Sequence, residues 1–239
     1  MAPNFINSGK LVEGMQGAFP RQGMLMGQNL LPELAYSLVV VVVCLIIYYK
    51  INELYQLSSH KGLKYFRNTF GYFSLAYGVK LASRFIILTT QVRGRGYFLP
   101  FFEIITVYAS LLAVMYLIYS MIWRNLEGTK FEEEHTLHLM AFFLSAVAVS
   151  ARHPIVYLIA QVLIVSYGIW VWFSHNKKPG GKKTKINALY PPLLLFFVLN
   201  IVDLFVPSFL IFAQHLIYIA SSLLFVLILY KLLRIGSKK

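Results

Sequence analysis

Seven apolar runs follow one another along the chain, separated by short polar or glycine-containing segments. Most are close to the ~20 residues that an α-helix needs to cross the hydrocarbon core of a bilayer. Because a backbone in lipid must satisfy its own hydrogen bonds, each run is predicted to be a helix. The predicted spans are 31–49, 66–90, 98–123, 135–151, 154–173, 186–206 and 208–233.

This pattern predicts an all-α membrane protein, built as a seven-transmembrane-helix bundle. Residues 31–234 are the expected transmembrane domain. Residues 1–30 are expected to form an extracellular tail at the bilayer interface, since they lack the continuous apolar region and cleavage site of a signal peptide. Residues 235–239 are the expected cytoplasmic tail. Residues 55–67 are expected to be a basic loop between the first two spans.

Composition supports a membrane environment. Hydrophobic residues make up 58% of the 239 residues and charged residues 13%, against about 25% charged residues in a soluble domain. A chain with so few charges could not cover a water-exposed surface. The chain has a single cysteine, Cys44, which lies in an apolar run. An internal disulfide is excluded because there is no second cysteine.

The basic residues give the orientation. Fifteen of the 22 Lys and Arg residues fall on one side of the predicted spans and five on the other, while Lys80 and Arg84 lie inside a span. The positive-inside rule makes the first side cytoplasmic, with the N-terminus outside and the C-terminus inside. The Lys-rich segment 175–185 is expected to contact anionic lipid at that face, so the surplus charge does not call for nucleic acid.

Aromatic residues gather near the predicted cytoplasmic helix ends, where Tyr and Trp favour the membrane interface. The residues expected at that interface are Tyr48, Tyr49, Tyr65, Trp123, Trp170, Trp172, Tyr190 and Tyr230.

Two sets of matches indicate an internal 3+1+3 parallel repeat. Ser110 matches Ser221 at an offset of 111 residues, and Glu103 then falls on Gln214. An offset of 120 places Lys80 on Asn200. With one intervening helix, the two three-helix units would have the same orientation and a pseudo-two-fold axis along the membrane normal.

This 3+1+3 arrangement is similar to small sugar transporters of the SWEET class, and its helix count and orientation resemble opsins and G-protein-coupled receptors. The resemblance is one of architecture. The last span has no lysine between Phe209 and Tyr230, so a retinal Schiff base is not expected, and SWEET-like proline pairs are absent from the first two spans.

Polar residues from five spans fall in the predicted outer half of the bilayer, where each charged group costs about 2.5–3.5 kcal/mol to insert. Arg84 or Lys80 is expected to pair with Glu103, and Asp203 with His215 or with the second cation. One interpretation is a pocket open to the outside that binds a small polar or anionic ligand. The other is a set of interhelical bonds that fixes the bundle. The predicted ligand-binding cluster is Lys80, Arg84, Glu103, Gln161, Asn200, Asp203, Gln214 and His215.

Glu134, His135 and His138 are weaker candidates for a metal site at the start of the fourth span, because their spacing allows them to share a helical face. The favoured interpretation is instead that the acidic residues there stabilise a helix N-terminus. No complete catalytic motif occurs, so no enzyme activity, bound metal or cofactor is predicted.

The favoured function is therefore a receptor-like or sensory protein of the cell membrane that binds a ligand from outside and acts through a cytoplasmic signalling protein. A homo-oligomer is the alternative to this protein partner. The alternative functions are a small-solute transporter with two three-helix repeats and a non-catalytic accessory or structural subunit.

Overall fold

The apolar runs fold into long helices, one for each predicted span. The computed structural model describes the backbone of residues 30–90, 95–126, 134–151, 154–176, 188–205 and 211–236. The expected tails, residues 1–29 and 237–239, and most of the Lys-rich segment lie outside these described residues. The helices are α2 (Leu30–Ser58), α3 (Lys61–Thr90), α4 (Arg95–Leu126), α5 (Glu134–Ser150), α6 (Pro154–Asn176), α7 (Tyr190–Phe205) and α8 (Ile211–Gly236).

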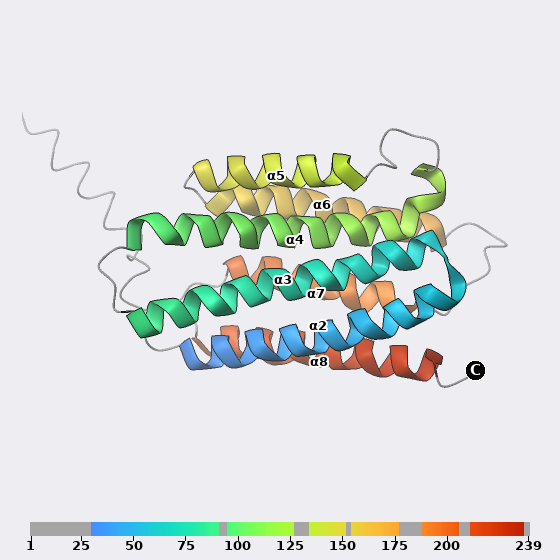
Figure 1. The fold of residues 1–239 in the computed structure, drawn as a ribbon, viewed down its shortest axis with the longest axis horizontal. Helices are drawn as coiled ribbons and strands as arrows, with labels where there is room; N and C mark the ends of the chain where they lie inside the picture. The colour runs from blue at the N-terminus through green and yellow to red at the C-terminus, as the bar shows by residue number, and fades with distance from the viewer. Residues whose placement is uncertain are drawn as a thin grey trace, which may run out of the picture.

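The helices lie side by side and alternate in direction, so that α2, α4, α6 and α8 all begin at the same end of the bundle (Figure 1). This end is called the Glu33 end below, after a residue in the first turn of α2. Each helix packs against the next in sequence, and α8 packs against α2, which closes a ring. One further contact, between α4 and α6, crosses the ring beside α5.

In the described part of the chain, four helices are long and apolar enough to cross a membrane. The segments that meet this condition are Leu31–Ser58, Pro100–Trp123, Ile155–Ser174 and Phe212–Arg234, in α2, α4, α6 and α8. Helices α5 and α7 are apolar but shorter, with 17 and 16 residues. Helix α3 has 30 residues and is more polar along its length. The fold is thus compatible with a membrane protein.

The prediction of a loop at residues 55–67 is wrong, because these residues are helical apart from a two-residue turn at Ser59 and His60. The Lys50 and Glu53 side chains form a 3.0 Å ion pair on α2 beyond the apolar run. Helix α2 ends at Ser58. The next residue, Ser59, has a positive φ of 51°, and its N–H still donates to the Tyr55 carbonyl over 2.7 Å. Polar residues thus extend both helices past the apolar segments that sequence hydropathy detects.

Phenylalanine side chains fill the space enclosed by α3, α7 and α8. Phe73 packs against Phe196 and Phe197 with ring centroids 5.3 and 4.8 Å apart, and Phe196 lies 4.4 Å from Phe225. All four rings are buried. These residues, called the phenylalanine layer below, form an apolar barrier across this part of the bundle.

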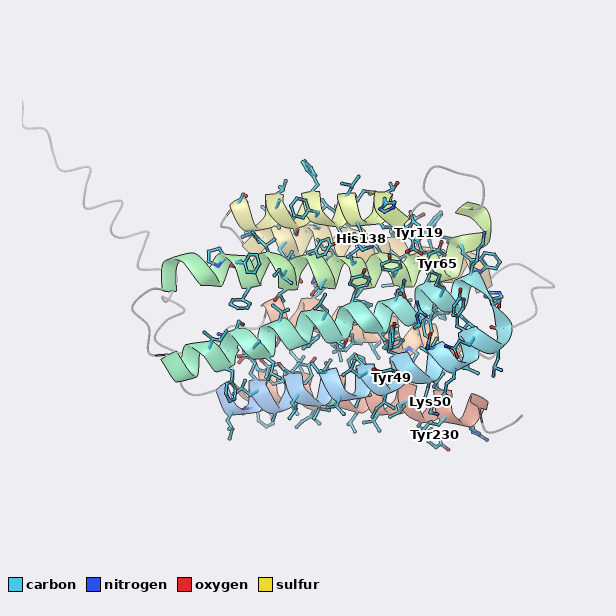
Figure 2. All side chains as sticks on the ribbon, in the orientation of Figure 1. Tyr49, Lys50, Tyr65, Tyr119, His138 and Tyr230 are labelled. Atoms are coloured by element: carbon cyan, nitrogen blue, oxygen red, sulfur yellow. The ribbon has the colours of Figure 1, made fainter. Side chains whose placement is uncertain are left out.

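The expected aromatic interface needs a correction. Tyr49 and Tyr230 are exposed on the neighbouring helices α2 and α8, close to Lys50, away from the Glu33 end (Figure 2). Tyr65 and Tyr190 are instead buried in the core. Tyr190 donates its hydroxyl hydrogen to the Ser120 carbonyl over 3.2 Å, which gives the buried hydroxyl a partner.

Candidate functional site

A carboxylate shared by two cations joins α2 to α3 at the Glu33 end. The Glu33 Oε1 atom lies 3.0 Å from Lys80 Nζ and 3.3 Å from Arg84 Nη2. Lys80 and Arg84 are four residues apart and therefore lie on the same face of α3. The Glu33 side chain is only 14% exposed. Its carboxylate is therefore largely shielded from water, and the two cations offset the cost of burying its charge.

The expected pairing of Lys80 or Arg84 with Glu103 is wrong. Glu103 is exposed on α4 and takes part in no ion pair among the described residues. Depth alone had suggested Glu103, but α3 turns this face toward α2 rather than toward the exposed side of α4. Glu33 was missed because it lies at the very start of the first apolar run, where a carboxylate looks like part of the tail.

Tyrosine hydroxyls continue the polar network inward from this ion cluster. The Tyr77 hydroxyl on α3 donates to the Asn200 side-chain carbonyl on α7 over 2.7 Å. It also lies 3.1 Å from the Tyr36 hydroxyl on α2. The Tyr36 ring stacks on Tyr218 of α8, with centroids 4.7 Å apart and planes 9° from parallel. The network therefore links four helices around the ring.

The tyrosine network rests directly on the phenylalanine layer. Tyr77 lies one helical turn from Phe73 on α3, and its ring centroid is 6.4 Å from that of Phe196. Asn200 uses its amide N–H to bond the Phe196 carbonyl over 2.9 Å. The polar groups at the Glu33 end therefore extend inward only as far as the phenylalanine layer.

Two predicted site residues keep buried polar atoms without a hydrogen-bond partner in the described part of the chain: Asp203 Oδ1 and His215 Nε2. Asp203 lies near the end of α7 and His215 near the start of α8, which pack against each other. The expected ion pair between them is not formed. Asp203 instead lies within electrostatic reach of Lys80, but that cation is already bound by Glu33.

The remaining predicted residues separate from this group. Gln161 is buried and donates to the hydroxyl of Tyr157 one turn earlier on α6. Tyr157 also interacts with Ser110, so this contact joins α6 to α4. Gln214 is half-buried on α8 beside His215. The structure thus brings Lys80, Arg84, Asn200 and Asp203 into one network, which we call the Glu33 network together with Glu33, Tyr36, Tyr77 and Tyr218.

A second polar cluster lies away from the Glu33 end, between α3, α4 and α5. His138 Nδ1 is 2.7 Å from the Tyr108 hydroxyl, and His138 Nε2 is 3.1 Å from the Tyr116 hydroxyl. The Tyr72 hydroxyl is 3.4 Å from the same Nε2 atom. Both imidazole nitrogens are therefore occupied by tyrosines. Figure 2 places His138 where α5 faces α4.

The three metal candidates do not converge. His138 points to the tyrosines, His135 is exposed, and the Glu134 carboxylate binds Lys64 at 2.6 Å. No group of three His, Cys, Asp or Glu residues within the described ranges is placed to hold a metal ion. The Glu134 carboxylate raises the pKa of the Lys64 amino group, because its hydrogen bond and charge stabilise the protonated form.

The fold and this site together define an all-helical protein whose apolar helices are long enough to cross a membrane and whose charged and aromatic network is gathered at one end. No family model matches the chain, and no solved structure matches it. An uncharacterized protein from Archaeoglobus fulgidus is 31% identical over 218 residues, which cover 84% of this chain and 91% of that relative. The chain belongs to the same family as this archaeal protein.

Proposed function

We propose that the chain is a multi-pass protein of the cell membrane with seven spans, an external N-terminus and a cytoplasmic C-terminus. It binds a small polar ligand at the Glu33 network from outside and passes the binding event to a cytoplasmic partner. It carries out no catalysis itself, and its other contacts are with the lipid bilayer, including anionic lipid at the cytoplasmic face.

The alternating helix directions support seven spans, although α5 and α7 are short. At about 1.5 Å per residue their 17 and 16 residues reach roughly 25 Å, near the hydrocarbon thickness of ~30 Å. Helix α3 is polar on the face that carries Lys80 and Arg84, and that face is covered by α2. The excess of basic residues at the end opposite to the Glu33 end supports an orientation with the Glu33 network in the outer half.

The single observation that carries the proposed sensor is the position of the Glu33 network above the phenylalanine layer. The network offers charged and polar groups toward the outside, and Phe73, Phe196 and Phe225 close the way inward. A transporter needs a hydrated route on both sides in the course of its cycle. A sensor needs only a shift in helix packing that depends on the ligand.

Helix α3 is a physical link between the two ends, because it contributes to both polar clusters. Tyr77 and Lys80 belong to the Glu33 network, while Tyr72 on the same helix reaches His138. A ligand that shifts α3 would therefore also change the contacts of Tyr72 beyond the phenylalanine layer. This gives the proposed signal a route toward the cytoplasmic end.

The alternative transporter is favoured by a different observation, the similarity of the two three-helix units. The contacts of α2 with α3 and of α3 with α4 correspond to those of α6 with α7 and of α7 with α8. The contact of α2 with α8 corresponds to that of α6 with α4. Within these contacts Tyr36 faces Ser221 and Tyr157 faces Ser110. These serines have the offset of 111 residues that the sequence repeat predicts.

Uptake into sealed vesicles separates the two functions. The purified chain would be reconstituted and tested with radiolabelled ammonium, carboxylate and hydroxyl compounds of up to about six carbons. The sensor predicts binding without uptake above that of protein-free vesicles. Saturable uptake that is lost in Arg84→Ala would replace the sensor with the transporter. Neither binding nor uptake, combined with a loss of folding in Arg84→Ala, would favour a structural subunit.

A further inference from the structure

The buried polar atoms in and beside the Glu33 network that have no hydrogen-bond partner define what a ligand must offer. Tyr77 is held between Tyr36 and Asn200, and the Asn200 amide is used at both ends. Lys80 and Arg84 both bind Glu33. The buried atoms without a hydrogen bond among the described residues are Asp203 Oδ1, His215 Nε2 and Ser221 Oγ, and Ser221 already faces Tyr36.

An acidic oxygen, Asp203 Oδ1, is therefore the main buried atom without a partner among the described residues. A buried carboxylate oxygen without a partner is costly in a low-dielectric site, and a ligand that donates hydrogen to it regains that free energy. Glu33 binds both Lys80 and Arg84, and Asp203 is the second carboxylate of the network. An anionic ligand would face the Asp203 carboxylate and would compete with Glu33 for the N–H groups of Lys80 and Arg84.

The surroundings of Asp203 are aromatic as well as acidic. Tyr36, Tyr77 and Tyr218 all lie within electrostatic reach of the Asp203 carboxylate. Tyrosine rings attract cations through their negatively charged faces, and Lys80 Nζ already lies 6.0 Å from the Tyr77 ring centroid. A carboxylate within electrostatic reach of three tyrosine rings is a suitable environment for an organic cation.

We propose that the ligand of the Glu33 network is a small organic ammonium compound, with the Asp203 carboxylate as its counter-ion and His215 Nε2 as a second acceptor. This inference rests on the outward-facing site of the proposed function and narrows its ligand to one chemical class. It excludes the anionic ligand that the sequence left open.

The probes are butylammonium, butyrate and butanol, which share a four-carbon chain and differ in the charge of the head group. Thermal unfolding of the purified full chain in detergent is followed at rising concentrations of each. Butylammonium is expected to raise the unfolding midpoint progressively, by about 5 °C once its concentration is far above its dissociation constant. Butyrate and butanol are expected to leave it unchanged at matched ionic strength.

Variants assign the effect to Asp203. Asp203→Asn removes the charge at nearly constant volume and is expected to abolish the shift. His215→Asn is expected to weaken the apparent affinity about tenfold. It also tests the site if Asp203→Asn does not fold. Glu103→Gln, which removes an exposed carboxylate of α4, is the matched control and should keep the full shift.

Three outcomes would overturn the ammonium ligand: stabilisation by butyrate instead of butylammonium, an equal shift in Asp203→Asn, or no shift with butylammonium. Stabilisation by butyrate would refute the inference and leave the proposed sensor standing. Saturable uptake of butylammonium into vesicles would instead refute the sensor and leave Asp203 as the counter-ion.

Discussion

The Glu33 carboxylate on α2 lies 3.0 Å from the Lys80 ammonium group on α3, and the same oxygen binds Arg84 at 3.3 Å. One carboxylate therefore binds two cations of the neighbouring helix. This relationship fixes α2 against α3 and occupies Lys80, a cation within electrostatic reach of Asp203.

Removal of the Glu33 charge is expected to destabilise the fold. Glu33→Gln leaves two partly buried cations without a carboxylate, and we expect a loss of about 2 kcal/mol in the free energy of unfolding. Denaturant unfolding in detergent measures it. Glu103→Gln is the control and should change the unfolding free energy by less than about 0.5 kcal/mol, since the side chain is exposed. Equal losses in both variants would contradict the ion cluster.

The turn between α2 and α3 depends on the absence of a side chain at Gly62. A Cβ at this position would lie 2.8 Å from Trp123 Nε1 and 2.9 Å from Trp123 Cδ1. Gly62→Ala is therefore expected to cost about 1–3 kcal/mol through overpacking. Gly78→Ala, on the same helix, has no atom within 4 Å of the new Cβ. It is expected to stabilise α3 by about 0.5–1 kcal/mol. A denaturation series that ranks the two variants in the opposite order would show that Trp123 packs elsewhere.

The tyrosine cluster around His138 predicts an unequal effect of two neighbouring histidines. His138→Phe keeps a ring but leaves the hydroxyls of Tyr108 and Tyr116 without their partner, which we expect to cost about 2 kcal/mol. His135→Phe affects an exposed position and should be within about 0.5 kcal/mol of the original chain. Unfolding curves of the two variants that coincide would argue against a structural role for the cluster.

The orientation predicts which cysteines react in intact cells. In a Cys44→Ser background, Asn7→Cys is expected to react with an impermeant thiol reagent, and Gly180→Cys only after the cells are opened. Both positions lie in polar segments of the chain. Labelling of Gly180→Cys but not of Asn7→Cys would reverse the topology and move the Glu33 network to the cytoplasmic half.

Hydropathy alone predicted the helices because a bilayer-length apolar run has few other conformations available to it. It placed their ends less well, since Lys50–Ser58 extends α2 through polar contacts that lie outside the apolar run. The same limitation hid Glu33, which stands at the beginning of such a run. Its position three residues before Tyr36, on the same side of the helix, was the signal that could have revealed it.

The candidate site was predicted in part. The predicted depth in the bilayer groups Lys80, Arg84, Asn200 and Asp203. This depth follows from the direction of each helix and the position of the residue within its span. Which helix faces which neighbour is not contained in depth, so Glu103 was paired wrongly and Gln161 was grouped with residues it does not contact. The tyrosines were overlooked because a Tyr in an apolar span looks like core or interface until its hydroxyl partner is known.

Accessibility of Asp203 from the two sides of the membrane tests the central claim most directly. Asp203→Cys in the Cys44→Ser background would be exposed to an impermeant thiol reagent in intact cells and, separately, in inside-out vesicles. An outward-facing Glu33 network above a closed phenylalanine layer predicts labelling in cells and none in the inside-out vesicles. Labelling in the inside-out vesicles would contradict it, because the reagent could then reach Asp203 from the cytoplasmic side.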